Sequence, residues 1–142
     1  MPSRYDNCQE ALTSVSLFSE LGKTQQRSLA RLMTSIKVPA GQVLTTEGKP
    51  GREFMIIMDG AASVRRGSQL VATLGAGDFL GEMSLITGTP QSATVTAETD
   101  MVLEILNRRE FSSLLDESPT VARKVMVGAV KRLQEVASDT IA

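Results

Sequence analysis

The sequence predicts a mainly β domain, an antiparallel β jelly roll (a double-stranded β-helix barrel) with flanking N- and C-terminal helices. Between residues 36 and 106, short segments rich in Val, Ile and Thr are separated by turns that contain glycine. The turns recur mostly at about ten residues, a spacing typical of β sandwiches and barrels. Helical periodicity on both sides of this region predicts the flanking helices. We therefore expect one domain over residues 1–142, with helices at 6–35, the jelly roll at 36–106 and helices at 107–138.

Two short helices are expected before the barrel. The first runs from about Asp6 to Ser14, and Thr24 is expected to cap the second. The second helix is predicted from apolar residues at helical spacing, which are Leu29, Leu32, Met33 and Ile36.

Within the barrel, the segment 54–58 is apolar at every position. Such a strand is covered on both faces, so we expect it to be central. Asp59-Gly60 lies between this segment and the next β segment, a dipeptide that predicts a hairpin.

Two helices are expected after the barrel. Asn107 is a suitable N-cap for a helix through Leu115. Ser118-Pro119 is an N-cap followed by proline at the first helical position, so a last helix starts there and runs to about Ser138. This last helix has a wide apolar face and a basic side.

Composition narrows the class of protein. The chain has 142 residues and a net charge of −1, so it has no bulk attraction to nucleic acid or to an acidic membrane. Its apolar runs are far shorter than the ~20 residues that span a bilayer, and its N-terminus lacks the apolar core of a signal peptide. The expectation is a cytoplasmic protein with neither a membrane nor a nucleic-acid partner.

Two shortages argue against an enzyme. The chain has no histidine, which removes the histidine-based nucleophile pairs and zinc motifs. Its single cysteine, Cys8, cannot form a zinc knuckle or an internal disulfide. We therefore expect no catalytic residue, no metal site and no cofactor.

The most informative segment is Phe79–Val95. Its sequence is Phe-Leu-Gly-Glu-Met-Ser-Leu-Ile-Thr-Gly-Thr-Pro-Gln-Ser-Ala-Thr-Val. A glycine-containing loop leads into a short helical turn, and a loop of this kind directs backbone N–H groups and the helix dipole at one place, which suits an anion.

This segment resembles the phosphate-binding cassette of the cyclic nucleotide-binding domain family, which reads Phe-Gly-Glu-x-x-Leu, a few residues, then Pro-Arg-x-Ala-x-Val. The resemblance extends over roughly residues 15–133. It implies the jelly-roll fold and a ligand, cAMP or cGMP.

The resemblance also implies roles for individual residues. Glu82 would accept a hydrogen bond from the ribose 2′-OH, or it would be only a first-turn helix acid. Gly81 would allow close backbone approach, or it would be a plain turn glycine. Other expected positions are the anion-lining Met83 and Ser84, the phosphate-side Ser92 and Ala93, and the apolar Val71, Leu74 and Leu80 near the base.

Gln91 stands where the family has its phosphate-binding arginine. Glutamine offers neutral donors where arginine offers a charged fork, so the exchange should cost about 1.5–3 kcal/mol of binding. Either the site binds weakly or uses a replacement cation, or it has lost its ligand.

The last helix has two roles in the family, as a lid over the base or as a dimer contact. Arg132 matches an arginine that lies close to the ligand in dimeric members. We hypothesise that Arg132 restores the missing positive charge; the alternative is a solvated helix charge.

Two functions follow. The first is a non-catalytic cyclic nucleotide sensor or regulatory module that acts in trans on an unknown protein partner, because no output domain is evident in the sequence. The second is a degenerate fold that no longer binds nucleotide and serves as a protein-interaction or homodimerisation module.

Overall fold

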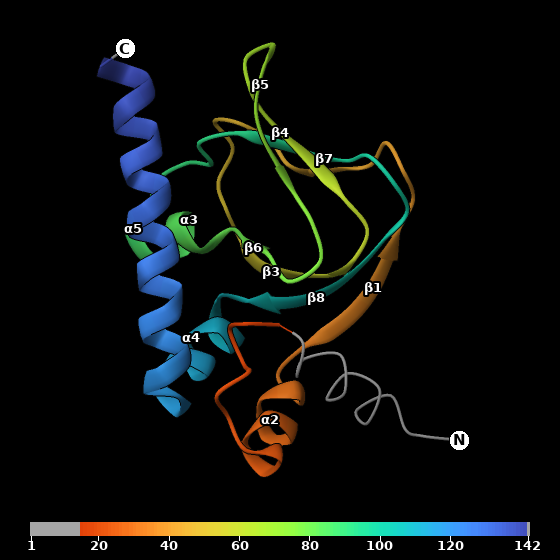
Figure 1. Ribbon diagram of the computed structural model, residues 1–142, viewed down its shortest axis with the longest axis vertical. Helices are drawn as coiled ribbons and strands as arrows, with labels where there is room; N and C mark the ends of the chain where they lie inside the picture. Colours follow the sequence, from red (N-terminus) through yellow and green to blue (C-terminus); the bar gives the residue numbers. More distant parts are fainter. Residues whose placement is uncertain (1–14, 142) are drawn as a thin grey trace.

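The computed structural model describes residues 15–141, and it confirms the predicted antiparallel jelly roll with flanking helices (Figure 1). Two four-stranded antiparallel sheets form the barrel, in the orders β1-β8-β3-β6 and β2-β7-β4-β5. The strands are β1 Thr34–Val38, β2 Val43–Thr45, β3 Glu53–Asp59, β4 Ala62–Arg66, β5 Gln69–Leu74, β6 Phe79–Leu80, β7 Thr94–Ala97 and β8 Met101–Asn107.

Four helices accompany the described strands. Helix α2 (Lys23–Ala30) and helix α4 (Arg108–Glu117) lie at one end of the barrel, and α5 (Pro119–Ile141) runs along its side (Figure 1). The short α3 (Glu82–Thr87) leaves the barrel between β6 and β7 and lies beside α5. This arrangement brings the cassette and the last helix together.

Strand β3 is central, as predicted, because it pairs with β8 on one side and β6 on the other. Its alternating side chains serve two cores. Phe54 and Ile56 belong to the cluster that also contains the helix side chains, whereas Met55 and Ile57 belong to the cluster shared with the second sheet. A strand apolar on both faces therefore joins the helices to the barrel.

The N-terminal predictions need correction. The helix expected at Asp6–Ser14 lies outside the described residues. Helix α2 has Gly22 at its N-cap rather than Thr24, and it ends at Ala30. Ile36 lies in β1, opposite Leu103 of β8, so the barrel strands begin at residue 34 rather than 36. The apolar spacing that suggested a longer helix is shared between a helix and a strand.

The hairpin prediction at Asp59-Gly60 is wrong. Strand β3 pairs with β6 and β8, whereas β4 pairs with β5 and β7, so this turn carries the chain from one sheet to the other. Gly60 has φ +98°, and a Cβ there would lie 2.5 Å from the carbonyl oxygen of Asp100. The glycine is needed for a tight turn, but the turn does not join paired strands.

The C-terminal caps are confirmed. The Asn107 side chain accepts a hydrogen bond from the Glu110 amide, and the Glu110 side chain accepts one from the Asn107 amide. The Ser118 hydroxyl accepts one from the Val121 amide at the start of α5. Helix α5 runs to Ile141, beyond the predicted end at Ser138. Among the described helices, none has the length and apolar character that a bilayer crossing requires.

Candidate ligand-binding site

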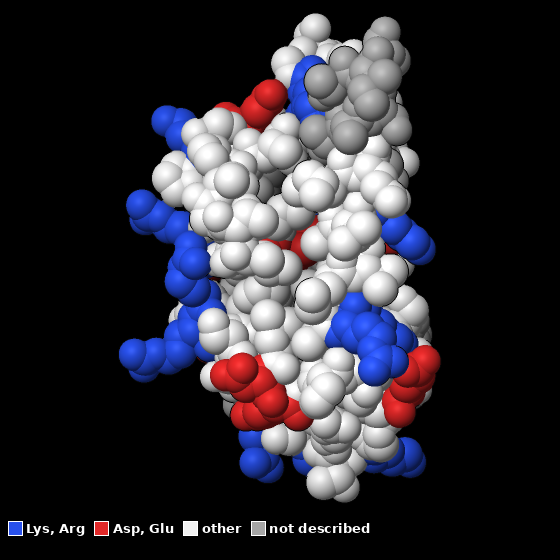
Figure 2. All heavy atoms as spheres, turned by 90° about the vertical axis from the view of Figure 1, so that its left-hand side faces the viewer, with Lys and Arg blue, Asp and Glu red and all other residues white. Residues whose placement is uncertain are grey.

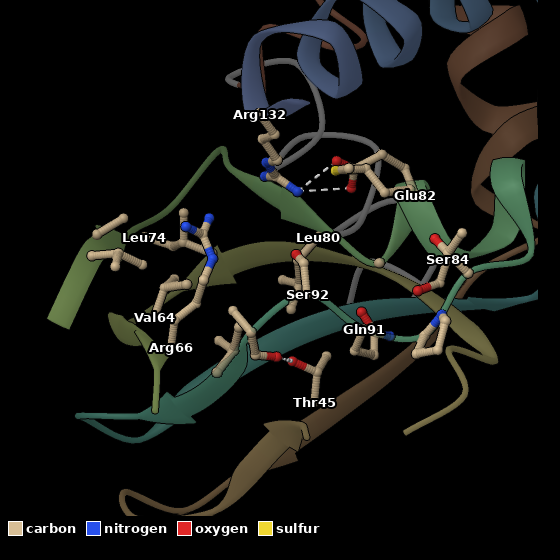
Figure 3. Close-up of a pocket in the computed structure, with 18 of the residues that line it drawn as sticks. Thr45, Val64, Arg66, Leu74, Leu80, Glu82, Ser84, Gln91, Ser92 and Arg132 are labelled. Atoms are coloured by element: carbon tan, nitrogen blue, oxygen red, sulfur yellow. Dashed lines mark hydrogen bonds and ion pairs between the residues drawn. The ribbon is translucent and has the colours of Figure 1, made fainter. Parts of the chain in front are cut away.

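A cavity of about 540 Å³ opens between the second sheet, the cassette and α5 (Figure 3). This volume is within the range of small-molecule sites. The cavity is lined by all ten of the predicted site residues, which are Val71, Leu80, Gly81, Glu82, Met83, Ser84, Gln91, Ser92, Ala93 and Arg132. Leu74, the third predicted apolar residue, also lines it.

Gly81 allows the backbone of the cassette to pack directly against β3 at the wall of the cavity. It has φ +94°, and a Cβ at this position would lie 2.2 Å from the carbonyl oxygen of Glu53 in β3. Any side chain here would collide with backbone, so the glycine is required by packing alone. The residue also forms the N-cap of α3 in a left-handed conformation.

Glu82, the first residue of α3, is completely buried. Its carboxylate accepts hydrogen bonds from Nη1 of Arg132 at 2.6 and 2.8 Å. Burial raises the pKa of Glu82 above its ordinary value, and the Arg132 charge and the hydrogen bonds offset only part of this effect. A buried acid thus lies at the cavity wall, in contact with the last helix.

Arg132 is held at three points. Besides the ion pair with Glu82, its Nη2 donates to the carbonyl oxygen of Phe79, and its guanidinium carbon lies 5.2 Å from the centre of the Phe79 ring. Gly128, one turn earlier on α5, lies against the same ring. Arg132 is therefore a residue of the cavity rather than a solvated helix charge.

Gln91 lies on the cavity wall beside Ser84. Its backbone pairs with the preceding loop, because its amide donates to the Lys49 carbonyl and its carbonyl accepts from the Gly48 amide, both at 2.9 Å. Gly51 allows this packing, since a Cβ there would lie 2.6 Å from Nε2 of Gln91 and 2.3 Å from the Cβ of Ser84. The amide side chain thus occupies the place where the cassette arginine was expected.

The other cassette residues differ in exposure. Ser84 is buried and Ser92 is exposed. Ala93 is buried, and its carbonyl accepts a hydrogen bond from the Thr45 hydroxyl at 3.1 Å. In Figure 3, Ser84 and Gln91 lie at one side of the cavity, and Val64 and Leu74 lie at the other. The cavity therefore has a polar end and an apolar end.

Several lining residues were not predicted from the sequence. They include Thr45, Val64, Arg66, Thr89, Pro90, Lys131 and Gln134. A signal existed for Val64 and Arg66, because residues two apart on a strand share a face. For Thr45, on β2, the sequence carried no such signal. Across the described residues, no group of acidic, cysteine or histidine side chains could hold a metal ion.

The cyclic nucleotide-binding domain model matches residues 35–118 of this chain. A cyclic nucleotide-gated potassium channel of Rhizobium etli is 36% identical over 123 residues, which are 87% of this chain and 34% of the channel. A cAMP-dependent protein kinase regulatory subunit of Yarrowia lipolytica is 37% identical over 106 residues, 73% of this chain and 28% of that protein. The chain thus spans about a third of the length of the curated relatives it matches.

Solved structures agree on the fold. The Thermus thermophilus catabolite activator protein superposes with a TM-score of 0.76 at 26% identity, over 87% of this chain and 61% of that one. The regulatory subunit of a cAMP-independent protein kinase A from Trypanosoma cruzi, bound to guanosine, gives 0.78 at 25% identity, over 98% and 51%. On these matches, the chain belongs to the cyclic nucleotide-binding domain family.

Proposed function

We propose that this domain is a non-catalytic regulatory module that binds a 3′,5′-cyclic purine nucleotide in the cavity. The observation that carries the proposal is the buried Glu82 carboxylate at the wall of a cavity of about 540 Å³ that also collects the cassette residues. A buried carboxylate is a strong acceptor for a sugar hydroxyl. Apolar side chains at the opposite end would cover the base.

The affinity is expected to be weak, because Gln91 is neutral. A cyclic phosphodiester carries a full negative charge, and a charge-assisted hydrogen bond contributes about 1.5–3 kcal/mol, roughly twice as much as a neutral one. Loss of the charge-assisted bond corresponds to about ten- to hundredfold in Kd. The Gln91 amide and the Ser84 hydroxyl would remain as donors at the polar end.

Arg132 would connect the ligand to α5. In the described structure its guanidinium is already paired with Glu82. A ribose hydroxyl that bonds to Glu82 would share or displace this contact, and the phosphate would offer the guanidinium a second anion. Ligand binding would then change the balance between docked and released α5. Delivery of this change to a separate partner stays a prediction, as does a cytoplasmic location.

Isothermal titration of the wild type and a Gln91→Arg variant tests the proposal. We expect Gln91→Arg to bind cAMP or cGMP about ten- to hundredfold more tightly than the wild type, because it returns the charged donor. Adenosine and guanosine are the matched ligands without phosphate, and their affinity should not rise with the substitution. Absence of heat from both proteins at millimolar cyclic nucleotide would contradict the proposal.

An Arg132→Ala variant separates the two sources of positive charge. If Arg132 replaces the cassette arginine, this variant should lose affinity for cyclic nucleotide but keep its affinity for the nucleosides. Equal affinity of wild type and Arg132→Ala for cAMP and cGMP would rule that role out.

A second candidate function, a protein-interaction module, rests on the outer face of α5. Met126, Val127, Val130 and Leu133 are 49–60% exposed along this helix. Figure 2 looks onto this side, and the middle of the surface is largely uncharged, with Lys and Arg gathered toward its edges. Exposed apolar stripes of this kind are typical of helix–helix contacts. A homodimer through α5 is the simplest form of this proposal.

Sedimentation equilibrium tests the dimer. Glutamate at positions 130 and 133 (Val130→Glu with Leu133→Glu) should convert a dimer to a monomer, because two charges would be buried in the contact. Lys37→Glu, which places a glutamate at an exposed position of β1 outside α5, is the matched control. A wild type that is monomeric at high micromolar concentration would contradict the dimer but not the nucleotide site.

A further inference from the structure

Arg66 contributes a guanidinium to the cavity in addition to that of Arg132. It is the last residue of β4 and lines the same cavity as Glu82 and the cassette. Nothing in the cassette pattern marks this position, because it lies well before Phe79 in the sequence. Arg66 and Arg132 reach the cavity from different elements, β4 and α5.

Arg66 lies at the end of the cavity that Val64 and Leu74 line, and it adds a charged group to their apolar side chains. It follows Val64 by two residues on β4, so both side chains are on the face of the sheet that lines the cavity. In Figure 3 its side chain points from β4 into the cavity on the side of Val64 and Leu74, and the cassette residues Ser84 and Gln91 lie at the other side. The position suits contact with a base rather than with the phosphate.

We infer that Arg66 determines base specificity and selects a 6-oxopurine, guanine in the simplest case. This inference rests on the proposed nucleotide site. A guanidinium presents two parallel N–H donors. Guanine offers two acceptors on one edge, O6 and N7, and receives such a pair fully. Adenine offers N7 beside an amino group, so one donor of the arginine would face another donor.

The neighbouring residue Arg65 provides a matched control. It is an exposed residue of the same strand, its Nη1 donates to the Ser68 carbonyl at 3.4 Å, and it does not line the cavity. Arg65→Met and Arg66→Met therefore remove the same charge from opposite faces of β4. A loss of long-range electrostatic attraction would affect both variants, whereas loss of a base contact would affect only Arg66→Met.

The experiment measures Kd for cGMP, cAMP and 3′,5′-cyclic IMP, which has the O6 and N7 acceptors but no 2-amino group. Titrations use the full chain and, to raise the affinity, the Gln91→Arg variant. We expect cGMP and cyclic IMP to bind about 5- to 150-fold more tightly than cAMP. Arg66→Met should abolish this preference by weakening the two 6-oxopurines, and Arg65→Met should keep it.

The outcomes separate the two claims. Binding of all three nucleotides without a preference, or an equal loss for all three in Arg66→Met, would overturn the role of Arg66 in base selection and leave the nucleotide site standing. Absence of binding to any of the three, in the wild type and in Gln91→Arg, would overturn the nucleotide site and this inference together. Circular dichroism and thermal unfolding of Arg66→Met confirm that the variant is folded before its affinities are compared.

Discussion

Glu82 and Arg132 form an ion pair that is buried on one side. The Glu82 side chain is inaccessible to solvent, whereas the Arg132 side chain is 30% exposed. Ion pairs with a buried carboxylate seldom stabilise a fold. The free energy needed to remove the carboxylate from water is about as large as the free energy gained from its attraction to the arginine. The raised pKa of Glu82 expresses that balance. The buried carboxylate therefore supports the proposed role of Glu82 in ligand binding.

The pH dependence of stability tests this view of Glu82. In the unfolded chain its pKa is near the ordinary 4.5, and burial raises the pKa in the folded state. The contribution of this group is therefore fully present below pH 4.5 and is lost as the pH rises through the folded pKa. Glu82→Gln cannot titrate. The free energy of unfolding should shift in favour of the variant, relative to the wild type, as the pH rises from 4.5.

Urea unfolding of both proteins at several pH values measures this difference. A difference in the free energy of unfolding that is constant with pH would mean that Arg132 fully offsets the effect of burial on the pKa of Glu82. A difference that moves in favour of the wild type as the pH rises would mean that Arg132 outweighs burial.

Gly81 allows a second test at the scale of one residue. Gly81→Ala should destabilise the fold by more than about 2 kcal/mol, because it adds a collision with the Glu53 carbonyl to the cost of a positive φ. Gly48→Ala is the matched control, since Gly48 has φ +83° with no atom within 4 Å of the added Cβ. If urea unfolding shows the same loss of unfolding free energy in both variants, the collision with the Glu53 carbonyl of β3 does not contribute to the destabilisation.

At the scale of elements, short sequence patterns correctly predicted the features that depend only on neighbouring residues, such as helix caps. Asn107 and Ser118 are correct caps because each hydrogen-bonds within its own turn. The end of α2 was not predictable in the same way, because pairing with the distant β8 decides that Ile36 is in a strand. Asp59-Gly60 marks a turn correctly, but which strands pair across a turn depends on the whole barrel.

The proposed output depends on how α5 docks against the Phe79 ring. A Cβ at Gly128 would lie 2.6 Å from the Phe79 ring, which itself packs against Phe54 with ring centres 5.5 Å apart. Helix propensity alone favours Val over Gly. If docking dominates, Gly128→Val should instead release α5 and speed hydrogen exchange of its amides around Arg132.

Hydrogen exchange measured by mass spectrometry compares this variant with Val127→Ala, a change at an exposed position of α5. Slower exchange in Gly128→Val than in the wild type would mean that α5 is not held by its contact with Phe79.

At the scale of the molecule, the sequence was sufficient for the barrel and for most of the cavity. Regular glycine turns predict a β barrel, and one contiguous cassette supplies most of the predicted site residues. The residues that escaped prediction, such as Thr45 and Arg66, reach the cavity from other strands. Strand alternation places Arg66 on the same face as Val64, but which face of β4 lines the cavity depends on how the two sheets face each other.

The most direct test of nucleotide binding is an NMR titration of the ¹⁵N-labelled wild-type chain with cGMP. We expect saturable shifts of the amide signals in two separate segments, the cassette at 81–93 and α5 around Arg132, with little change at the far end of the barrel. Saturation of both segments with one Kd would support a ligand that bridges Glu82 and α5. Shifts that are absent, unsaturable or scattered over the surface would contradict it.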